Sequence, residues 1–401
     1  MKIFKLFFWK IFKFFFNYLI KFNIINKIRT NLDYQIFNLN KKHVFSGYYD
    51  FCPISIDDKY LLCNVVDKDN QCKIGYFKID SKKNEFIEIS NTECWSWQLG
   101  ARLKWSKKFK NSFYFNYYSK EKKSLGTIRY SIDTKKFVFF KNCFFDINKD
   151  EDKKLFLNFE RLEHFRPGYG HKTNIHDNNF QKNSNEDGIF IQNINNDHDN
   201  NEPKLIIGLN EISELENKSH KKIPHYFNHI SFNPSGIKFL FFDCWEENNK
   251  RKTKIFISDL DGNYEAINNL DIASHYLWLD DNEILIFCKP RNNVIGFYKY
   301  NVFSKLFNFL PLFQKEDGHP VLGKDKKIII DTYPNQISYR SLFSYDERKN
   351  LKTEIGNFYT SNSFISGEKK CDLHPRNSIS DQYISIDLGK EEFRETVLLK
   401  V

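Results

Sequence analysis

The clearest pattern along the chain is an alternation of short apolar runs and polar turns. Its strongest copy runs from His225 to Trp245, where H-Y-F-N-H-I-S-F passes through the turn N-P-S-G and continues as the apolar run F-L-F-F. Runs of this length and character are typical of half-buried and buried strands, and Asn-Pro-Ser-Gly is a strong turn signal. The pattern predicts a histidine-bearing strand, a tight turn and a buried strand.

Weaker copies of this unit follow in the second half of the chain. They contain S-H-Y-L-W at 274–278, G-H-P at 318–320 and L-H-P at 373–375, and each leads through a polar turn to a strand-like run. Two upstream segments, 53–62 and 105–115, repeat the order of turn and strand. The turns recur at intervals of roughly 45 to 55 residues, which is typical of β-propeller blades. We therefore expect one propeller over residues 31–401.

The two ends of the chain predict how the ring closes. The last strands, 383–388 and 396–401, leave the final blade short of strands. A propeller commonly completes its C-terminal blade with an N-terminal strand, which removes an open sheet edge. Residues 33–39 form a short strand-like segment at the right place, so we predict that they close the ring.

The composition agrees with a single β-rich body. The 401 residues include 42 Phe and 21 Tyr, and aromatic residues pack well on a pleated surface. The eight cysteines form no C-x-x-C pair, and several lie inside apolar runs. This pattern predicts buried free thiols in a reducing compartment, as opposed to a disulfide framework or a zinc ribbon.

The net charge of +10 is concentrated at the N-terminus. Residues 1–29 contain seven basic residues and no acidic one, and on a helical wheel most lysines share one arc while the other arc is apolar. The uncharged runs are too short to span a bilayer, and no signal-peptide cleavage site follows. We predict that residues 1–30 form a helix in the plane of an anionic membrane. Packing of this helix against the core is the alternative.

The cysteines and this helix together predict a location. A protein with reduced thiols and a basic interfacial helix is expected at the cytoplasmic face of the plasma membrane. A periplasmic location is the alternative.

The histidines recur at one structural position. Five units carry a histidine next to the innermost strand: His43, His225 or His229, His275, His319 and His374. Residues at this position gather at one end of a propeller's central channel. Imidazoles from separate blades can ligate a divalent metal, and a neutral imidazole can act as a general base. A structural role is the alternative for any one of them.

Arginines and aromatic residues are expected at the same end of the channel. They are Arg102, Arg161, Arg166, Tyr48, Tyr49, Trp95, Trp97 and Tyr169. Arginine binds carboxylates in bidentate fashion and aromatic faces stack on sugar rings, so this set suits an acidic saccharide. An internal ion pair of Arg161 with Glu160 or Glu163 is the alternative.

Other functional classes fit poorly. The chain has no G-x-x-x-x-G-K-[ST] loop for phosphates and no G-x-G-x-x-G after a strand. Its basic residues do not gather with aromatic residues on one repeated strand, as single-stranded nucleic acid would require. We therefore expect no nucleic acid partner.

Several motifs resemble one known family. H-Y-F-N-H-I-S-F-N-P-S-G, S-H-Y-L-W, D-G-H-P with D-T-Y-P, and D-L-H-P-R resemble the oligogalacturonate lyases, especially relatives found among bacterial surface-polysaccharide biosynthesis proteins. G-Y-Y-D, W-x-W-Q-x-G and E-R-L-x-x-x-R-P-G-Y-G resemble these relatives as well. The resemblance implies a seven-bladed propeller of the WD40 or TolB type. It also implies a histidine-bound divalent metal, typically Mn²⁺, and β-elimination at a uronic acid.

The resemblance assigns a role to individual residues of this chain. His275, His319 and His374 would ligate the metal, and His229 or His225 would be the base. Arg161 or Arg166 would bind the substrate carboxylate. Further substrate contacts would come from Tyr48, Tyr49, Trp95, Gln98, Arg102 and Tyr169.

One departure from the family concerns the metal ligands. The lyases supply several ligands, including a glutamine, from one late stretch, whereas residues 371–375 offer one histidine. Asp317 or Asp372 could complete the set, although either could equally cap a turn.

Three functional classes follow from these observations. The first is a metal-dependent lyase acting on a uronate-containing glycan. The second is a non-catalytic propeller that binds an acidic glycan or a lipid-linked precursor during polysaccharide assembly. The third is a protein-interaction scaffold.

Overall fold

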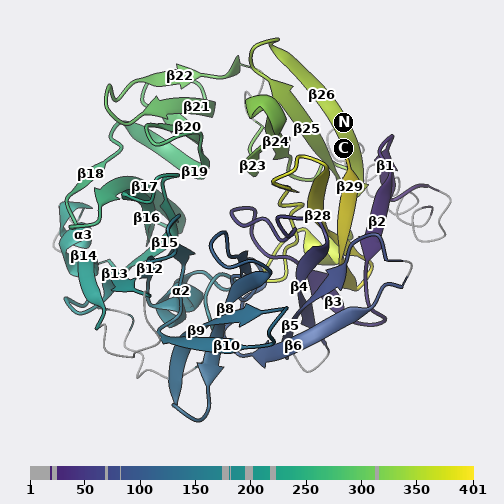
Figure 1. Cartoon of the computed structure of the whole chain (residues 1–401). Coiled ribbons are helices and arrows are strands. Elements are labelled where there is room, and N and C mark those ends of the chain that lie inside the picture. The colour runs from purple at the N-terminus through teal and green to yellow at the C-terminus, as the bar shows by residue number, and fades with distance from the viewer. Residues whose placement is uncertain are drawn as a thin grey trace.

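A computed structural model describes residues 19, 25–67, 71–81, 83–173, 180, 182–194, 202–216, 223–311 and 316–401. These residues form seven antiparallel sheets arranged in a ring, which is a seven-bladed β-propeller (Figure 1). The predicted fold is therefore confirmed. Most of the predicted N-terminal helix, residues 1–18 and 20–24, lies outside the described residues.

The first four blades follow the chain from β3 to β18. Blade 1 contains β3 (His43–Phe45), β4 (Tyr60–Val66), β5 (Cys72–Lys78) and β6 (Phe86–Thr92). Blade 2 contains β7 (Lys104–Trp105), β8 (Ser112–Ser119), β9 (Ser124–Ser131) and β10 (Phe137–Lys141). Blade 3 contains β11 (Asp146–Ile147), β12 (Lys153–Phe156), β13 (Gly188–Asn193) and β14 (Lys204–Gly208). Blade 4 contains β15 (His225–Phe232), β16 (Lys238–Glu247), β17 (Lys250–Asp259) and β18 (Tyr264–Ala266).

The last three blades complete the ring. Blade 5 contains β19 (Leu270–Trp278), β20 (Glu283–Pro290), β21 (Gly296–Asn301) and β22 (Phe307–Phe309). Blade 6 contains β23 (Pro320–Leu322), β24 (Ile328–Asp331), β25 (Tyr339–Asp346), β26 (Leu351–Tyr359) and, at its outer edge, β1 (Ile28–Thr30). Blade 7 contains β27 (Arg376–Asn377), β28 (Tyr383–Lys390), β29 (Phe393–Lys400) and β2 (Tyr34–Phe37).

The apolar runs of the sequence become strands that are buried on both faces. In β16, Phe239, Leu240, Phe241 and Phe242 are all buried, because each face of this strand packs against other apolar side chains of the core. A strand buried on both faces has a continuous apolar run instead of an alternating one. This explains why the run after the N-P-S-G turn is the strongest strand signal in the sequence.

Ring closure uses the N-terminal chain. Within the segment predicted to close the ring, β2 pairs antiparallel with β29, with Tyr34 opposite Leu399 and Phe37 opposite Thr396. The strand β1 pairs with β26 and covers the outer edge of blade 6. Residues 28–30 are thus a strand, which corrects the predicted C-terminal end of the helix over residues 1–30. The physical reason is that β-branched Ile28 and Thr30 suit a strand and that the edge of β26 supplies the hydrogen bonds.

Helices are few in the described part of the chain. The helix α2 (Phe159–Phe165) lies between β12 and β13, and Asn158 caps it by accepting a hydrogen bond from the backbone N–H of Arg161. The helix α3 (Leu209–Glu216) follows β14, and two short 3₁₀ turns, η2 (Lys324–Lys326) and η3 (Asn362–Phe364), lie in blade 6 and after it. None of the helices found among the described residues is long and apolar enough to cross a membrane.

Candidate metal centre and substrate site

Three histidines from three consecutive blades lie side by side. His275 lies in β19 of blade 5, His319 directly precedes β23 of blade 6, and His374 comes shortly before β27 of blade 7. The ring centroids of His275 and His319 are 4.2 Å apart, and those of His319 and His374 are 4.4 Å apart. The structure therefore brings together the three residues that the resemblance assigns to a metal.

Irregular backbone directs these side chains. The pairing of β19 with β20 shifts register between Ala273 and Tyr276, so His275 lies in a bulge. His374 has a positive φ of 45°, and His229 of β15 has a positive φ of 53° beside a second register shift. Left-handed backbone is costly for a residue other than glycine, and bulges commonly redirect side chains near active sites. His229 and His374 are thus held in left-handed backbone, and His275 in a bulge.

Each of the three imidazoles has its Nδ1 atom held by an acceptor. The Nδ1 of His275 lies 2.8 Å from a carboxylate oxygen of Asp317, and that of His319 lies 2.9 Å from Asp331. The Nδ1 of His374 lies 3.1 Å from the backbone oxygen of Gly47. Because carboxylates and carbonyls accept hydrogen bonds, Nδ1 carries the proton and Nε2 keeps its lone pair. Metal-binding histidines are usually oriented in this way.

The Nε2 atoms are suited to a cation. The Nε2 of His374 is buried and has no hydrogen-bond partner within the described structure. Burial lowers the pKa of His319, and burial together with the nearby His319 lowers the pKa of His374 well below its usual value. Both imidazoles are therefore neutral at neutral pH, which is the form that binds metals.

A carboxylate completes the cluster. Ligand atoms of His319, Asp372 and His374 lie within 4.8 Å of one another. Burial opposes ionisation of Asp372, but Arg340 and Lys370 outweigh it and lower the pKa of Asp372 well below its usual range. Of the two acids considered from sequence, Asp317 therefore supports His275, whereas Asp372 lies in the group whose ligand atoms are close enough together to hold a metal ion. Imidazoles and a carboxylate form a donor set that fits a divalent cation.

The sequence left two candidates for the base, His225 and His229. The structure shows that their surroundings differ. His225 is fully buried, with its Nδ1 2.9 Å from Asp243 and its ring stacked on Trp245 at 4.9 Å. His229 instead stacks on Tyr48 at 5.3 Å, and Tyr48 also contacts His374 at 4.8 Å. His229 therefore lies beside the histidine cluster, whereas His225 is held by structural contacts.

His229 has the properties of a general base. Burial and neighbouring imidazole and guanidinium groups lower its pKa well below the usual value, so it is neutral at neutral pH. Among the described residues, neither ring nitrogen has a hydrogen-bond partner. A neutral, unpartnered imidazole is able to accept a proton from a bound molecule.

The predicted arginines have different surroundings. Arg161 donates to the backbone oxygens of His225 and Lys182 at 2.7 and 3.0 Å, and to the side chain of Asn183 at 3.1 Å. Its guanidinium therefore ties α2 to blade 4. Arg166 lies over the ring of Tyr169 at 4.9 Å and is only half-buried. Arg166 is thus the better placed of the two for a substrate carboxylate.

Arg102 and Gln98 are engaged inside the protein. Arg102 forms a bidentate pair with Asp50 at 3.1 and 2.8 Å and also donates to the backbone oxygen of Phe145. Gln98 donates from its side chain to the backbone oxygen of Lys370 at 2.6 Å, and from its backbone to that of Gly168 at 2.9 Å. These contacts indicate structural roles, in contrast to the substrate contacts implied by the resemblance.

The aromatic residues divide into two groups. Tyr48 and Tyr169 both contact the ring of His229, and Tyr49 packs against His319 at 5.2 Å while its hydroxyl donates to the backbone of Tyr276. Trp95 instead packs against Trp97 at 5.1 Å and lines a separate cavity of about 530 Å³. Tyr48, Tyr49 and Tyr169 are therefore at the histidine cluster, whereas Trp95 lines a different cavity.

Two residues of the site were not assigned from the sequence. Asp331 accepts hydrogen bonds from the ring and backbone of His319 and from the backbone of His374. Tyr333 lies 6.3 Å from the rings of both His275 and His319 and is 38% exposed, so it lies on an open side of the cluster. Both belong to the D-T-Y-P motif, the sequence feature from which they could have been assigned to the site.

Comparisons with known proteins agree with the fold. No protein-family model and no curated protein matches the sequence. Among solved structures, an oligogalacturonate lyase from Vibrio parahaemolyticus matches with a TM-score of 0.62 and 12% identity over 93% of this chain and 98% of that chain. An oligogalacturonate lyase in complex with manganese matches with a TM-score of 0.65 and 11% identity over 93% and 94%. The predicted resemblance is therefore confirmed at the level of the fold.

His43, the fifth recurrent histidine, lies apart from the cluster. Its Nδ1 accepts a hydrogen bond from the backbone N–H of Arg394 at 3.3 Å, and its ring packs against Trp97 at 4.9 Å. Burial, followed by the charges of Arg394 and Lys369, lowers the pKa of His43 to about 4. Its role is structural, and it is neutral in the folded protein at neutral pH.

His43 makes stability depend on pH. The folded pKa of about 4 lies below the ordinary value of 6.5, so protons bind preferentially to the unfolded chain and stability falls as the pH drops from 6.5 to 4. Because solvent screens part of the effect, we expect a loss on the order of 1 to 2 kcal/mol. His43→Asn keeps an acceptor but removes the titration. Urea unfolding at pH 7 and pH 4.5 should show a smaller drop for His43→Asn, and equal drops would contradict this assignment.

Proposed function

We propose that this protein is a divalent-metal-dependent propeller that acts on a uronate-containing glycan by β-elimination. The observation that carries the proposal is the convergence of His275, His319 and His374, each with Nδ1 held by an acceptor. The neutral His229, whose ring nitrogens have no hydrogen-bond partner in the described structure, contacts Tyr48, which also contacts His374 of this cluster. A cation site and a free base side by side are what proton abstraction next to a carboxylate requires.

The three histidines and Asp372 would hold the metal. Manganese is supported by the bound manganese of one structural neighbour and by the mixed nitrogen and oxygen donors. A bound divalent cation would act as a Lewis acid that stabilises the negative charge developing on the substrate carboxylate. The chain's own contribution is to fix the three imidazoles through Asp317, Asp331 and the backbone of Gly47.

His229 would accept the proton from C5 of the uronic acid. Its ring is oriented by stacking on Tyr48 and by the edge of Tyr169, with centroid distances of 5.3 and 6.1 Å. Its left-handed backbone at the bulge of β15 directs the side chain out of the regular strand. The proton would move to the imidazole, the C5–H electron pair would form the double bond between C4 and C5, and the bond from C4 to the glycosidic oxygen would break, with that oxygen taking a proton from water.

Arg166 and Tyr169 would bind the substrate beside the base. Arg166 lies over the Tyr169 ring, and both are half-buried, so a guanidinium and an aromatic face are available together. Guanidinium groups bind carboxylates in bidentate fashion, and aromatic faces stack on sugar rings. This pair would therefore select an acidic sugar.

A second function, glycan binding without cleavage, is favoured because the other two predicted arginines are occupied by contacts within the protein. Arg102 and Arg161 are used by internal contacts, which leaves Arg166 as the arginine of the predicted set that can reach a carboxylate. A lyase site usually needs several groups to stabilise developing charge. The alternative is a propeller that binds an acidic glycan or a lipid-linked precursor in surface-polysaccharide biosynthesis and does not cleave it.

We also propose a location at the cytoplasmic face of the plasma membrane. The support is the basic, acid-free composition of residues 1–29 together with eight free cysteines. Lysines near an anionic bilayer each contribute about 1 kcal/mol to binding. This location would place the propeller where lipid-linked precursors are assembled.

The base is tested by comparing two histidine substitutions. The purified protein is incubated with Mn²⁺ and oligomers of galacturonic acid, and the ultraviolet absorbance of the unsaturated uronate product is recorded. Because a general base contributes about 10²- to 10⁴-fold, His229→Asn should lower the rate by about 100-fold or more. The same change at exposed His164 is the control and should leave the rate unchanged.

Each outcome of this assay distinguishes the two candidate functions. Equal rates for His229→Asn and His164→Asn would contradict the role of His229. Calorimetric binding of Mn²⁺ and the oligomer without any product from the wild-type protein would support the binding function instead of the lyase.

Membrane association is tested with vesicles containing anionic lipid. Changing Lys2, Lys5, Lys10 and Lys13 to Gln should weaken binding by about 1 kcal/mol for each lysine. Changing the exposed Lys135 and Lys136 to Gln is the control and should have little effect. Sedimentation with the vesicles measures the bound fraction, and unchanged binding of the first variant would refute the membrane proposal.

A further inference from the structure

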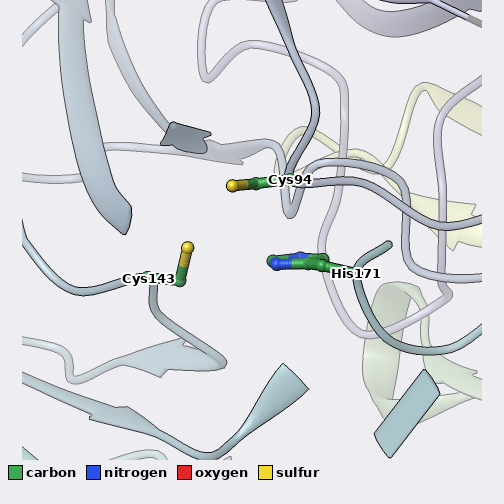
Figure 2. A group of neighbouring side chains, drawn as sticks. All are labelled: Cys94, Cys143 and His171. Atoms are coloured by element: carbon green, nitrogen blue, oxygen red, sulfur yellow. The ribbon is translucent and has the colours of Figure 1, made fainter. Parts of the chain in front are cut away.

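A second cluster of metal-ligating side chains lies outside the histidine site. Cys94 comes from the connection between β6 and β7, Cys143 from that between β10 and β11, and His171 from the segment after α2. Their ligand atoms all lie within 4.8 Å of one another. Figure 2 shows the two sulfur atoms and the edge of the imidazole directed at one small space between three chain segments.

The cluster is buried and rigidly held. The exposed fractions of Cys94, Cys143 and His171 are 0%, 3% and 2%. The His171 ring stacks on Phe159 at a centroid distance of 4.1 Å and an angle of 3°, and its backbone N–H donates to the Phe159 carbonyl at 3.1 Å. The imidazole is therefore fixed in place before any ligand arrives.

One atom of the cluster lacks a partner. The Nδ1 of His171 is buried and has no hydrogen-bond partner in the described part of the chain. Leaving a buried polar atom unsatisfied costs about 1 to 3 kcal/mol, so natural proteins rarely retain one without a reason. A metal ion bound at Nδ1 would take the place of the missing hydrogen-bond partner and offset this cost.

We propose that Cys94, Cys143 and His171 form a zinc site. Two thiolates and one imidazole are soft and borderline donors, which favour Zn²⁺ over the harder Mn²⁺. The histidine cluster offers imidazole nitrogens and a carboxylate, so the two sites select different metals. The fourth position on the zinc would be taken by water or a small ligand, because three protein ligands are present.

A cavity lies beside one member of the cluster. Cys143 and Phe159 are among the residues that line a cavity of about 590 Å³ next to α2. The described cavity of about 530 Å³ near Trp95 has Gly168 and Lys172, from the segment after α2, in its wall.

The zinc would stabilise the loop that carries Tyr169, which is proposed above to bind the substrate. His171 ends a segment in which Gly168 and Gly170 donate their backbone N–H groups to Glu163 at 2.9 and 3.0 Å. Tyr169 lies inside this segment and contacts His229. Bonds from the zinc to Cys94 and Cys143 would link this loop to blades 1, 2 and 3. Its role is thus structural, and it extends beyond the histidine site.

Cobalt is the probe that separates the two sites. Reduced, metal-free protein is titrated with Co²⁺, and the near-ultraviolet charge-transfer absorption between thiolate and cobalt is measured. Histidine and carboxylate ligands give no such band. We expect the band in the wild-type protein and in the variant with His275, His319 and His374 changed to Ala, and we expect Zn²⁺ to abolish it.

Variants of the cluster complete the test. Cys94→Ser with Cys143→Ser should remove the band, and His171→Gln should weaken Co²⁺ binding at least about tenfold. Cys288→Ser, which alters a buried thiol of β20, is the matched control and should keep the band. No band in the wild-type protein, or a band that survives in the double variant, would overturn the proposal.

Discussion

The candidate site depends on one buried carboxylate. Asp331, at the end of β24, is 1% exposed and accepts hydrogen bonds from the backbone and ring of His319 and from the backbone of His374. A buried carboxylate is costly unless hydrogen bonds compensate it, so these three donors and Asp331 stabilise one another. One side chain thus joins blade 6 to blade 7, because it orients the imidazole of His319 and fixes the backbone of His374.

Ring closure is the second condition for the site, because the site spans the seam between the last and first blades. Asp387 of β28 accepts hydrogen bonds from Ser46 and Thr396 and pairs with Arg376 at 2.6 Å. This buried network, together with the pairing of β2 with β29, holds residues 46–49 against blade 7. Gly47 can then support His374, and Tyr48 can lie between His374 and His229.

Sequence reasoning predicted the elements that local patterns encode. The apolar runs and turns identified the repeated strands, and the recurrent histidine position identified His275, His319 and His374, which the ring brings together. Contacts between distant segments were not predictable. The spacing of residues along the chain could not show that Arg161 donates hydrogen bonds to His225 and Asn183. Nor could it show that Cys94 and Cys143 lie next to His171. These contacts form only when segments that are distant in sequence pack together.

The central claim is that imidazoles from blades 5, 6 and 7 share one divalent cation. The most direct measurement is an anomalous-difference map recorded at the manganese absorption edge from crystals soaked in Mn²⁺. A single strong peak bounded by the Nε2 atoms of His275, His319 and His374 is expected. A map with no peak at this position, or with manganese bound only elsewhere on the propeller, would contradict it.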